Sequence, residues 1–249
     1  MDSALAIDAD GLARRFGSRW VLRGATLQLA AGEAAGLVGA NGSGKSTLLR
    51  VLATLLRPSA GHAAVFGADL VRHPDRVREA IGFFSPVPGV YDDLTAGENL
   101  MFAADMLGRP HDDAMASLAR VGLAEVARER VRGFSSGMLR RLALARLLLQ
   151  RPRLLLLDEP YNNLDAGGIA LVNDTIRDTL TRGGAVLAVV HDVASAVGVL
   201  ERWFALRDGR VTEAADGVAA GEAAFVSAAG ARGWPSPGTA SATPAAAGR

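Results

Sequence analysis

The segment GANGSGKST, residues 39–47, constrains the fold of this chain more than any other stretch. It fits the pattern G-x-x-x-x-G-K-[ST] and lies between the apolar run AAGLVG and the segment KSTLLRVLATLL, which we expect to be helical. In such an order of strand, glycine-rich turn and helix, backbone N–H groups and the helix N-terminus point toward a bound phosphate. The sequence therefore predicts an α/β fold with a phosphate loop at the end of a buried strand.

Each residue type in this loop suits a nucleotide phosphate. The glycines let the backbone curl so that successive N–H groups face a β-phosphate. Lys45 can reach the β- and γ-phosphates, and Ser46 offers a hydroxyl to Mg²⁺. The expected nucleotide-binding residues of the loop are Gly39, Ala40, Asn41, Gly42, Ser43, Gly44, Lys45, Ser46 and Thr47.

Strands and helices are expected to alternate along the rest of the chain. Apolar runs that suit strands are ALAID, RWVLRGATLQLA, IGFF, LLLLD and AVLAVV, and WFALRDGRVTE is expected to be a hairpin that turns at Asp208 and Gly209. Thr95 and Glu98 form a capping box for a helix. Met138, Leu142, Ala145 and Leu149 share one face of a later helix, which ends before Pro152. This alternation is typical of a largely parallel sheet.

Composition excludes several classes of function. The formal net charge is +1, so there is no electrostatic reason to expect nucleic acid as a partner, and we interpret the basic residues between 128 and 153 as a solvated helix face. The chain has no cysteine, which excludes disulfides and thiolate metal sites and fits a reducing cytosol. The N-terminus lacks the pattern of a signal peptide. Residues 216–249 are rich in alanine, glycine and proline, and we expect a disordered tail there.

Acidic and histidine side chains follow two of the expected strands. Asp158 and Glu159 come at the end of LLLLD, where the ligands of open α/β sheets collect. Asp158 is expected to hold Mg²⁺ together with Ser46, and Glu159 to orient and polarise an attacking water. His191 follows AVLAVV at the same edge of the sheet. Taken alone, the acidic pair could be a helix N-cap and the histidine could be structural, and the phosphate loop favours the functional interpretation.

A second candidate anion site lies in GFSSGMLRR, residues 133–141. Two serines and a glycine open a helix there, so hydroxyls and free backbone N–H groups are available to an anion. The phosphate loop already serves one anion, so this second site needs a different explanation.

Together these segments resemble the nucleotide-binding subunits of ATP-binding cassette (ABC) transporters over residues 4–213. The resemblance implies a P-loop ATPase with a mostly parallel sheet, an N-terminal antiparallel β portion and an inserted helical subdomain at about 93–150, within a domain of residues 1–215. It implies that Phe16 stacks on adenine, that NNLD ending at Asp165 is the D-loop, and that His191 is the switch residue. FSSGM is similar to the signature loop, which in this family acts across a head-to-tail dimer. The residues assigned to that role are Ser135, Ser136 and Gly137.

Three positions depart from the family pattern. In the signature loop, Ser136 replaces a glycine and Met138 replaces a glutamine, and Pro86 occupies the place of a glutamine that contacts Mg²⁺ and the attacking water. Proline offers neither a donor nor a side-chain oxygen, so we expect slower hydrolysis or a water in place of the missing amide.

The resemblance also implies partners: a second copy or a homologous ATPase subunit, and an integral membrane subunit that contacts the surface around residues 83–94. It places the chain in the cytoplasm, on the inner face of the cell membrane, with ATP and Mg²⁺ as cofactors. The segment VYDDLTAGENLMFAADMLG and the compact core are similar to the ATPase of the haem exporter used in c-type cytochrome maturation. Three alternatives stay open: the ATPase of another small-molecule or drug exporter, a regulatory or DNA-repair ATPase, and an ATP-gated binding module with little turnover.

Overall fold

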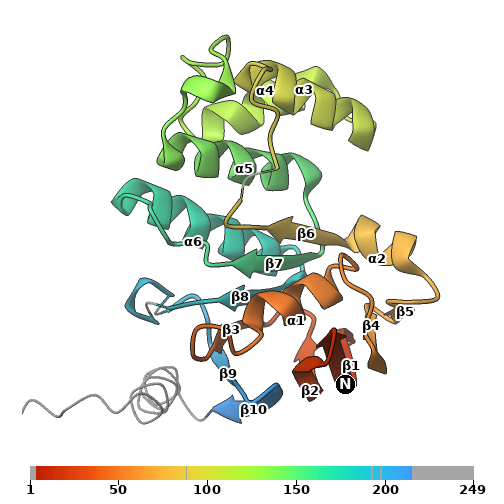
Figure 1. The fold of residues 1–249 in the computed structure, drawn as a ribbon. Helices are drawn as coiled ribbons and strands as arrows, with labels where there is room; N and C mark the ends of the chain where they lie inside the picture. Colours follow the sequence, from red (N-terminus) through yellow and green to blue (C-terminus); the bar gives the residue numbers. More distant parts are fainter. Residues whose placement is uncertain (1–3, 88, 192, 197, 215–249) are drawn as a thin grey trace, which may run out of the picture.

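The computed structural model describes residues 4–87, 89–191, 193–196 and 198–214. The tail predicted at 216–249 lies outside the described residues. Within them, two sheets and six α-helices form stacked layers (Figure 1). The alternation of strands and helices confirms the predicted α/β class.

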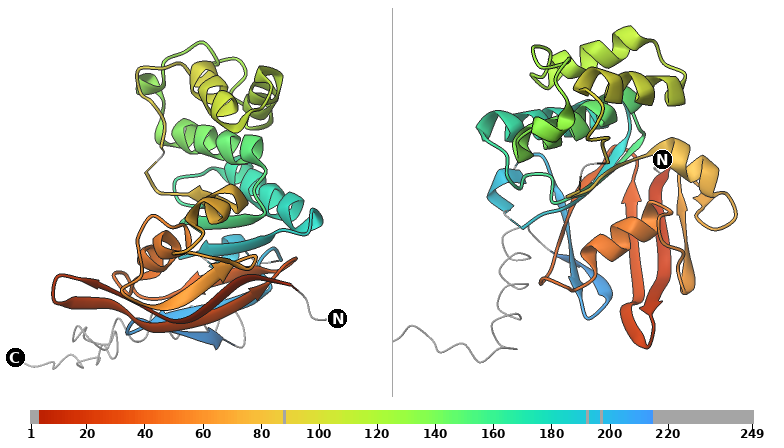
Figure 2. Two further views of the ribbon diagram at one scale, coloured as in Figure 1. Left: turned by 90° about the vertical axis from the view of Figure 1, so that its right-hand side faces the viewer. Right: turned by 45° about the horizontal axis from the view of Figure 1, so that its top comes forward.

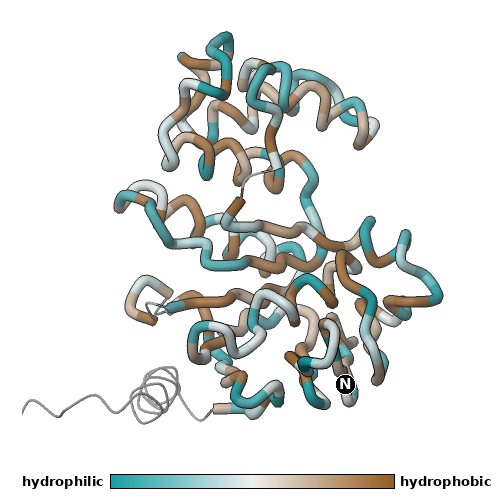
Figure 3. The backbone as a smooth tube through the Cα atoms, in the orientation of Figure 1, coloured by the Kyte–Doolittle hydropathy of each residue, from teal (hydrophilic) through white to brown (hydrophobic). Residues whose placement is uncertain are grey.

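The central sheet has six strands in the order β10-β9-β3-β8-β7-β6. All neighbouring pairs are parallel except β9 and β10, which form the predicted antiparallel hairpin. The strands are β3 (Ala34–Val38), β6 (Ile81–Phe84), β7 (Leu154–Asp158), β8 (Ala185–Val189), β9 (Arg202–Arg207) and β10 (Arg210–Ala214). Every residue of β3, β7 and β8 is buried, as expected for parallel strands that are covered on both faces. Figure 3 shows hydrophobic residues concentrated along these central strands.

The second sheet is antiparallel and has the order β2-β1-β4-β5. Its strands are β1 (Leu5–Phe16), β2 (Arg19–Ala30), β4 (Ala60–Val65) and β5 (Ala68–Asp69). β1 extends well beyond the predicted segment ALAID, because it pairs with β2 along its whole length, from Leu5 opposite Ala30 to Phe16 opposite Arg19.

Helices cover both faces of the central sheet (Figure 2). They are α1 (Lys45–Leu52), α2 (Pro74–Ala80), α3 (Ala96–Leu107), α4 (His111–Arg120), α5 (Ser136–Gln150) and α6 (Ala166–Thr181), with short 3-10 helices at Val131–Gly133 and Val193–Ala196. α1, α2 and the antiparallel sheet share one hydrophobic core, whereas α3, α4, α5 and α6 share the other. Along β7, Leu154 and Leu156 face the first core, and Leu155 and Leu157 face the second. This alternation follows from the two-residue period of a strand.

The helical segment between β6 and β7 differs from the sequence expectation in detail. The predicted capping box is confirmed, because Glu98 N–H donates to Thr95 Oγ1 at 3.1 Å and Thr95 N–H donates to Glu98 Oε2 at 2.7 Å. The sequence did not predict α4, which buries three residues against the same core. Leu107, the last residue of α3, is 41% exposed.

α1 is shorter than predicted. It ends at Leu52 rather than near Leu56, because Thr54 takes a left-handed φ of 59° and the N–H groups of the next two residues both donate to the carbonyl of Arg50. A left-handed residue after the last turn is a common way to end a helix.

Candidate nucleotide site

The loop between β3 and α1 adopts a backbone that its glycines permit. Gly42 and Gly44 have φ values of 77° and 112°, and Gly44 is the N-cap of α1. A Cβ atom on Gly39 would lie 2.5 Å from the carbonyl oxygen of Leu206, so a larger residue would push the loop away from β9. The loop is thus held at the carboxyl edge of the sheet, where ligands of open α/β sheets bind.

Lys45 lies buried against this loop. Its Nζ donates to the carbonyl oxygens of Gly39 at 2.8 Å and Ala40 at 3.1 Å. Burial lowers the pKa of Lys45, while the charges of Glu159 and Asp158 raise it. An ammonium group is therefore fixed at the loop, with two carboxylates nearby.

Ser46 and Asp158 meet as the sequence predicts. Ser46 Oγ donates to Asp158 Oδ1 at 3.1 Å, although the two residues are 112 positions apart. Asp158 is 1% exposed, and burial raises the pKa of its carboxyl against the opposing effect of the Ser46 hydrogen bond. A hydroxyl and a carboxylate side by side form an oxygen donor set that fits Mg²⁺.

Both the backbone and the carboxylate of Glu159 are held by polar contacts. Its φ is 54°, a left-handed value that is uncommon for a residue with a side chain. Its N–H donates to the carbonyl of Val189, and its own carbonyl accepts from Arg140 Nη1 at 3.2 Å. His191 Nε2 lies 2.8 Å from Glu159 Oε1, and Asn162 Nδ2 donates to Glu159 Oε2 at 2.7 Å.

Sequence reasoning missed two of these contacts. Arg140 is 7% exposed, its pKa is lowered by burial, and it comes from α5 on the far side of β7. Asn162 follows Glu159 by three residues in the turn after β7, and its backbone N–H also donates to the Glu159 carbonyl. A polar residue three positions after the strand-end glutamate was the available signal for Asn162. No local pattern could have indicated Arg140.

Ser135, Ser136 and Gly137 lie at the N-terminus of α5. Ser135 is the N-cap, and its Oγ accepts from the N–H of Met138 at 3.3 Å. Both serines are exposed. α5 and α1 lie on opposite faces of the central sheet (Figure 1), so within one chain the predicted second anion site does not face the phosphate loop.

Asp165 is the N-cap of α6. Its Oδ1 accepts from Gly168 N–H at 2.8 Å and pairs with Arg141 Nη2 at 2.8 Å. These two contacts, the Gly168 bond first, lower the pKa of Asp165. The carboxylate thus ties α6 to α5, the helix that begins at the two serines.

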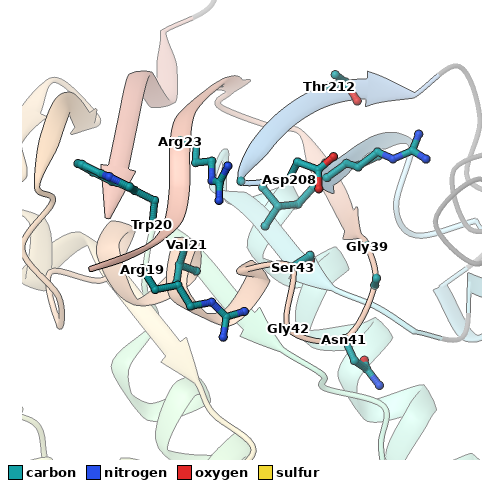
Figure 4. Close-up of a pocket in the computed structure, with 15 residues that line it drawn as sticks. Arg19, Trp20, Val21, Arg23, Gly39, Asn41, Gly42, Ser43, Asp208 and Thr212 are labelled. Carbon is teal, nitrogen blue, oxygen red and sulfur yellow. The ribbon is translucent and has the colours of Figure 1, made fainter. Parts of the chain in front are cut away.

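A cavity of about 430 Å³ lies beside the phosphate loop, between β2 and the β9–β10 hairpin (Figure 4). Arg19 and Val21 face the loop across it, whereas the ring of Trp20 is directed away. Three arginines and one acid line the cavity, so it is electropositive: Arg19, Arg23, Arg207 and Asp208. The buried hydroxyl of Ser43 also lies at this cavity and has no hydrogen-bond partner among the described residues.

Phe16 does not line this cavity, but its cross-strand partner Arg19 does. The ring of Phe16 is 44% exposed and the guanidinium of Arg14 lies 4.7 Å from its centroid. The predicted aromatic is therefore outside the lining of this cavity, and a cation lies over its ring.

Comparison with known proteins decides the family. The family model described as ABC transporter matches residues 22–162, more than half of the 249 residues. The chain belongs to the ABC transporter family. The predicted fold class is confirmed.

Curated ABC proteins of several kinds are similar to this chain. It is 38% identical over 214 residues to a daunorubicin resistance ATP-binding protein of Streptomyces coeruleorubidus, covering 83% of this chain and 66% of that protein. It is 43% identical over 195 residues to an aliphatic sulfonates import protein of Xanthomonas axonopodis, covering 76% of each. It is 38% identical over 192 residues to the cytochrome c biogenesis export protein CcmA of Methylococcus capsulatus, covering 76% of this chain and 93% of that protein. The chain thus spans just under two thirds of the daunorubicin resistance protein.

Among solved structures, the ATP-binding subunit of an ABC transporter is similar, with a TM-score of 0.77 and 25% identity over 84% of this chain and 89% of that one. No helix among the described residues of this ABC chain is long and apolar enough to cross a membrane.

Proposed function

We propose that this ABC protein binds MgATP and hydrolyses it as the ATPase subunit of a membrane transporter. The convergence of Lys45, Ser46, Asp158, Glu159 and His191 beside one phosphate loop carries the proposal. In this function the loop N–H groups and Lys45 hold the β- and γ-phosphates. Adenine stacks on the exposed ring of Phe16, in place of the Arg14 guanidinium.

Ser46 and Asp158 are the residues that would hold Mg²⁺. When bound, the ion neutralises phosphate charge during phosphoryl transfer. The two oxygens already lie 3.1 Å apart, so little rearrangement is needed to present both to one cation.

Glu159 is the proposed general base. A water attacks the γ-phosphorus, its proton passes to the Glu159 carboxylate, and the bond from phosphorus to the bridging oxygen breaks to leave ADP and phosphate. His191, at 2.8 Å from the carboxylate, orients it and contacts the γ-phosphate. Pro86, where the family usually has a glutamine, is exposed and cannot assist with a side-chain amide.

The exposed serines of α5 support a head-to-tail dimer. Because they do not face the phosphate loop of their own chain, the anion that Ser135 and Gly137 bind is the γ-phosphate held by a second copy. Two-fold pairing then creates two equivalent sites. ATP favours the closed dimer by contacts that ADP cannot make.

A groove of about 640 Å³ between β6, α3 and α5 suits the membrane partner. Its lining includes exposed apolar residues, among them Val87 at 76% and Met106 at 75%. Exposed apolar residues gathered in one groove mark interaction sites. We propose that an amphipathic helix on the cytoplasmic side of an integral membrane subunit covers them, with this chain on the inner face of the membrane.

Haem export for c-type cytochrome maturation is the substrate assignment we propose, supported by the 93% share of CcmA that the chain covers. Drug export is the second candidate, supported by the 38% identity to the daunorubicin resistance protein. In the native host, a chromosomal Glu159→Gln replacement separates them. Loss of haem-stained c-type cytochromes supports the first, whereas unchanged cytochromes with increased anthracycline sensitivity overturn it in favour of the second.

The ATPase proposal is tested by steady-state turnover of the purified protein beside Glu159→Gln, with Glu125→Gln as an exposed control for the same chemical change. We expect Glu159→Gln to lose about 10²- to 10⁴-fold in turnover and to accumulate an ATP-dependent dimer on gel filtration. Equal turnover in the Glu159→Gln variant would contradict the role of Glu159. ATP binding without turnover in the wild type would favour the ATP-gated module, with Pro86 as the cause.

A further inference from the structure

The turn after β7 contains a contact that the proposed function does not use. Asn162 Nδ2 donates to Glu159 Oε2 at 2.7 Å, and the backbone N–H of Asn162 donates to the Glu159 carbonyl at 3.4 Å. The side chain of Asn162 thus reaches the reactive carboxylate from within the same turn. His191 reaches the other oxygen of that carboxylate from the end of β8.

The backbone of Glu159 is already fixed, so the remaining freedom lies in its side chain. The left-handed φ and the bonds from Glu159 N–H and to Glu159 C=O hold the main chain. With His191 alone, the carboxylate could rotate about its terminal torsion, which has a broad energy profile. The second donor, on the opposite oxygen, removes that rotation.

An amide donor suits this place chemically. An ionised carboxylate has about four lone-pair sites, and His191 and Asn162 occupy two of them, which leaves acceptor capacity on each oxygen for a water proton. A general base must lie within hydrogen-bond reach of the proton it takes. Among the described residues, Asn162 is the one side-chain amide bonded to Glu159.

We propose that Asn162 is a positioning residue for hydrolysis, which acts through Glu159 and aims its free lone pairs at the attacking water. The inference rests on the proposed role of Glu159 as general base. It also explains how a site with Pro86 in place of a glutamine can retain a side-chain amide near the base. Asn162 acts on the orientation of the carboxylate and makes no contribution to holding the phosphates.

The test is a double-mutant cycle in steady-state ATPase activity. We expect Asn162→Ala to lower kcat by about tenfold to a hundredfold, the loss that a displaced catalytic group produces, with KM for ATP within about twofold. Asn162→Asp should lower kcat further, because a second carboxylate repels Glu159, and Asn162→Ser should recover part of kcat, because it keeps a donor. In the Glu159→Gln background, Asn162→Ala should have no further effect.

Asn173→Ala is the control for simple loosening of the turn. Asn173 Oδ1 accepts from the hydroxyl of Tyr161, which adjoins Asn162, and it makes no contact with Glu159. We expect its kcat to stay within about twofold of the wild type, since the carboxylate contacts are intact. An equal loss of kcat in Asn173→Ala would show that Asn162 is structural and overturn the proposal.

The remaining outcomes separate this proposal from the one on which it rests. Turnover that is lost in Glu159→Gln but unchanged or raised in Asn162→Ala overturns the role of Asn162 alone. An effect of Asn162→Ala that persists undiminished in the Glu159→Gln background also overturns it. Turnover that survives in Glu159→Gln, or is absent from the wild type, overturns both proposals.

Discussion

Replacing Ser135 tests whether the N-terminus of α5 is an anion site or merely a capped helix end. The Ser135 hydroxyl accepts from the N–H of Met138 at 3.3 Å, near the long limit of a hydrogen bond. Loss of a serine N-cap costs about 0.5–2 kcal/mol, and the long distance places Ser135→Ala in the lower half of that range. For a chain of this size, about 1 kcal/mol lowers Tm by roughly 2–4 °C.

Ser135→Asp should change stability and function in opposite directions. Aspartate caps at least as well as serine, and its charge at a helix N-terminus adds about 0.3–1 kcal/mol of stability. If a γ-phosphate from the partner binds there, however, two like charges at about 4 Å repel by about 4 kcal/mol at an effective dielectric constant of 20. Because the dimer has two such sites, the repulsion totals about 8 kcal/mol, and the ATP-dependent dimer should weaken by about 10⁶-fold, while Tm is equal to or above that of the wild type.

The assay combines thermal unfolding with sedimentation in MgATP, in the Glu159→Gln background that traps the dimer. Thr95→Asp makes the same kind of cap exchange at α3, and it should leave dimerisation unchanged. A Ser135→Asp protein that dimerises like the parent would refute the proposed contact with the partner's phosphate. A Ser135→Ala protein with unchanged Tm would refute the energetic role of the cap.

Two further predictions concern the scaffold of the site. Gly36→Ala places a Cβ atom 2.3 Å from Cζ3 of the buried Trp203, so it should destabilise the protein by about 1–3 kcal/mol through overpacking. In urea denaturation, adding Trp203→Leu to Gly36→Ala should recover part of that loss of stability. If the two substitutions instead destabilise additively, the clash is disproved. The hydrogen bond from the Thr95 backbone N–H, and after it the bond with the Thr95 side chain, lowers the pKa of the Glu98 carboxyl. The Glu98 carboxylate therefore stabilises the fold above its unfolded-state pKa, and this stabilisation is lost as pH falls through its folded-state pKa. Glu98→Gln should therefore show a smaller decrease in stability between pH 6 and about pH 3, and an identical pH profile would contradict the capping role of the carboxylate.

Local patterns predicted much of this fold because the interactions behind them are local. The phosphate loop, the capping box at Thr95 and the hairpin at Asp208 each depend on residues within a few positions of one another. The buried strands could also be predicted from the sequence, since a parallel strand covered on both faces must be apolar throughout. α4 was missed because its sequence, HDDAMASLAR, has only two large apolar residues, Met115 and Leu118, and its three buried residues pack where α4 meets α3 and α5.

The sequence by itself also predicted the side chains to which we assign the chemistry, because their residue types and their positions at strand ends can be recognised without a structure. Their contacts were decided by the tertiary structure. Glu159 and His191 are 32 residues apart, and Asp165 and Arg141 are 24 apart, so their pairing depends on the order of strands and on which helices cover them. The same applies to Arg140 and to the cavity, whose lining includes Arg19 but not Phe16. The chemistry of each residue can be read from the sequence itself, whereas the distances between remote segments follow from the packing of the whole domain.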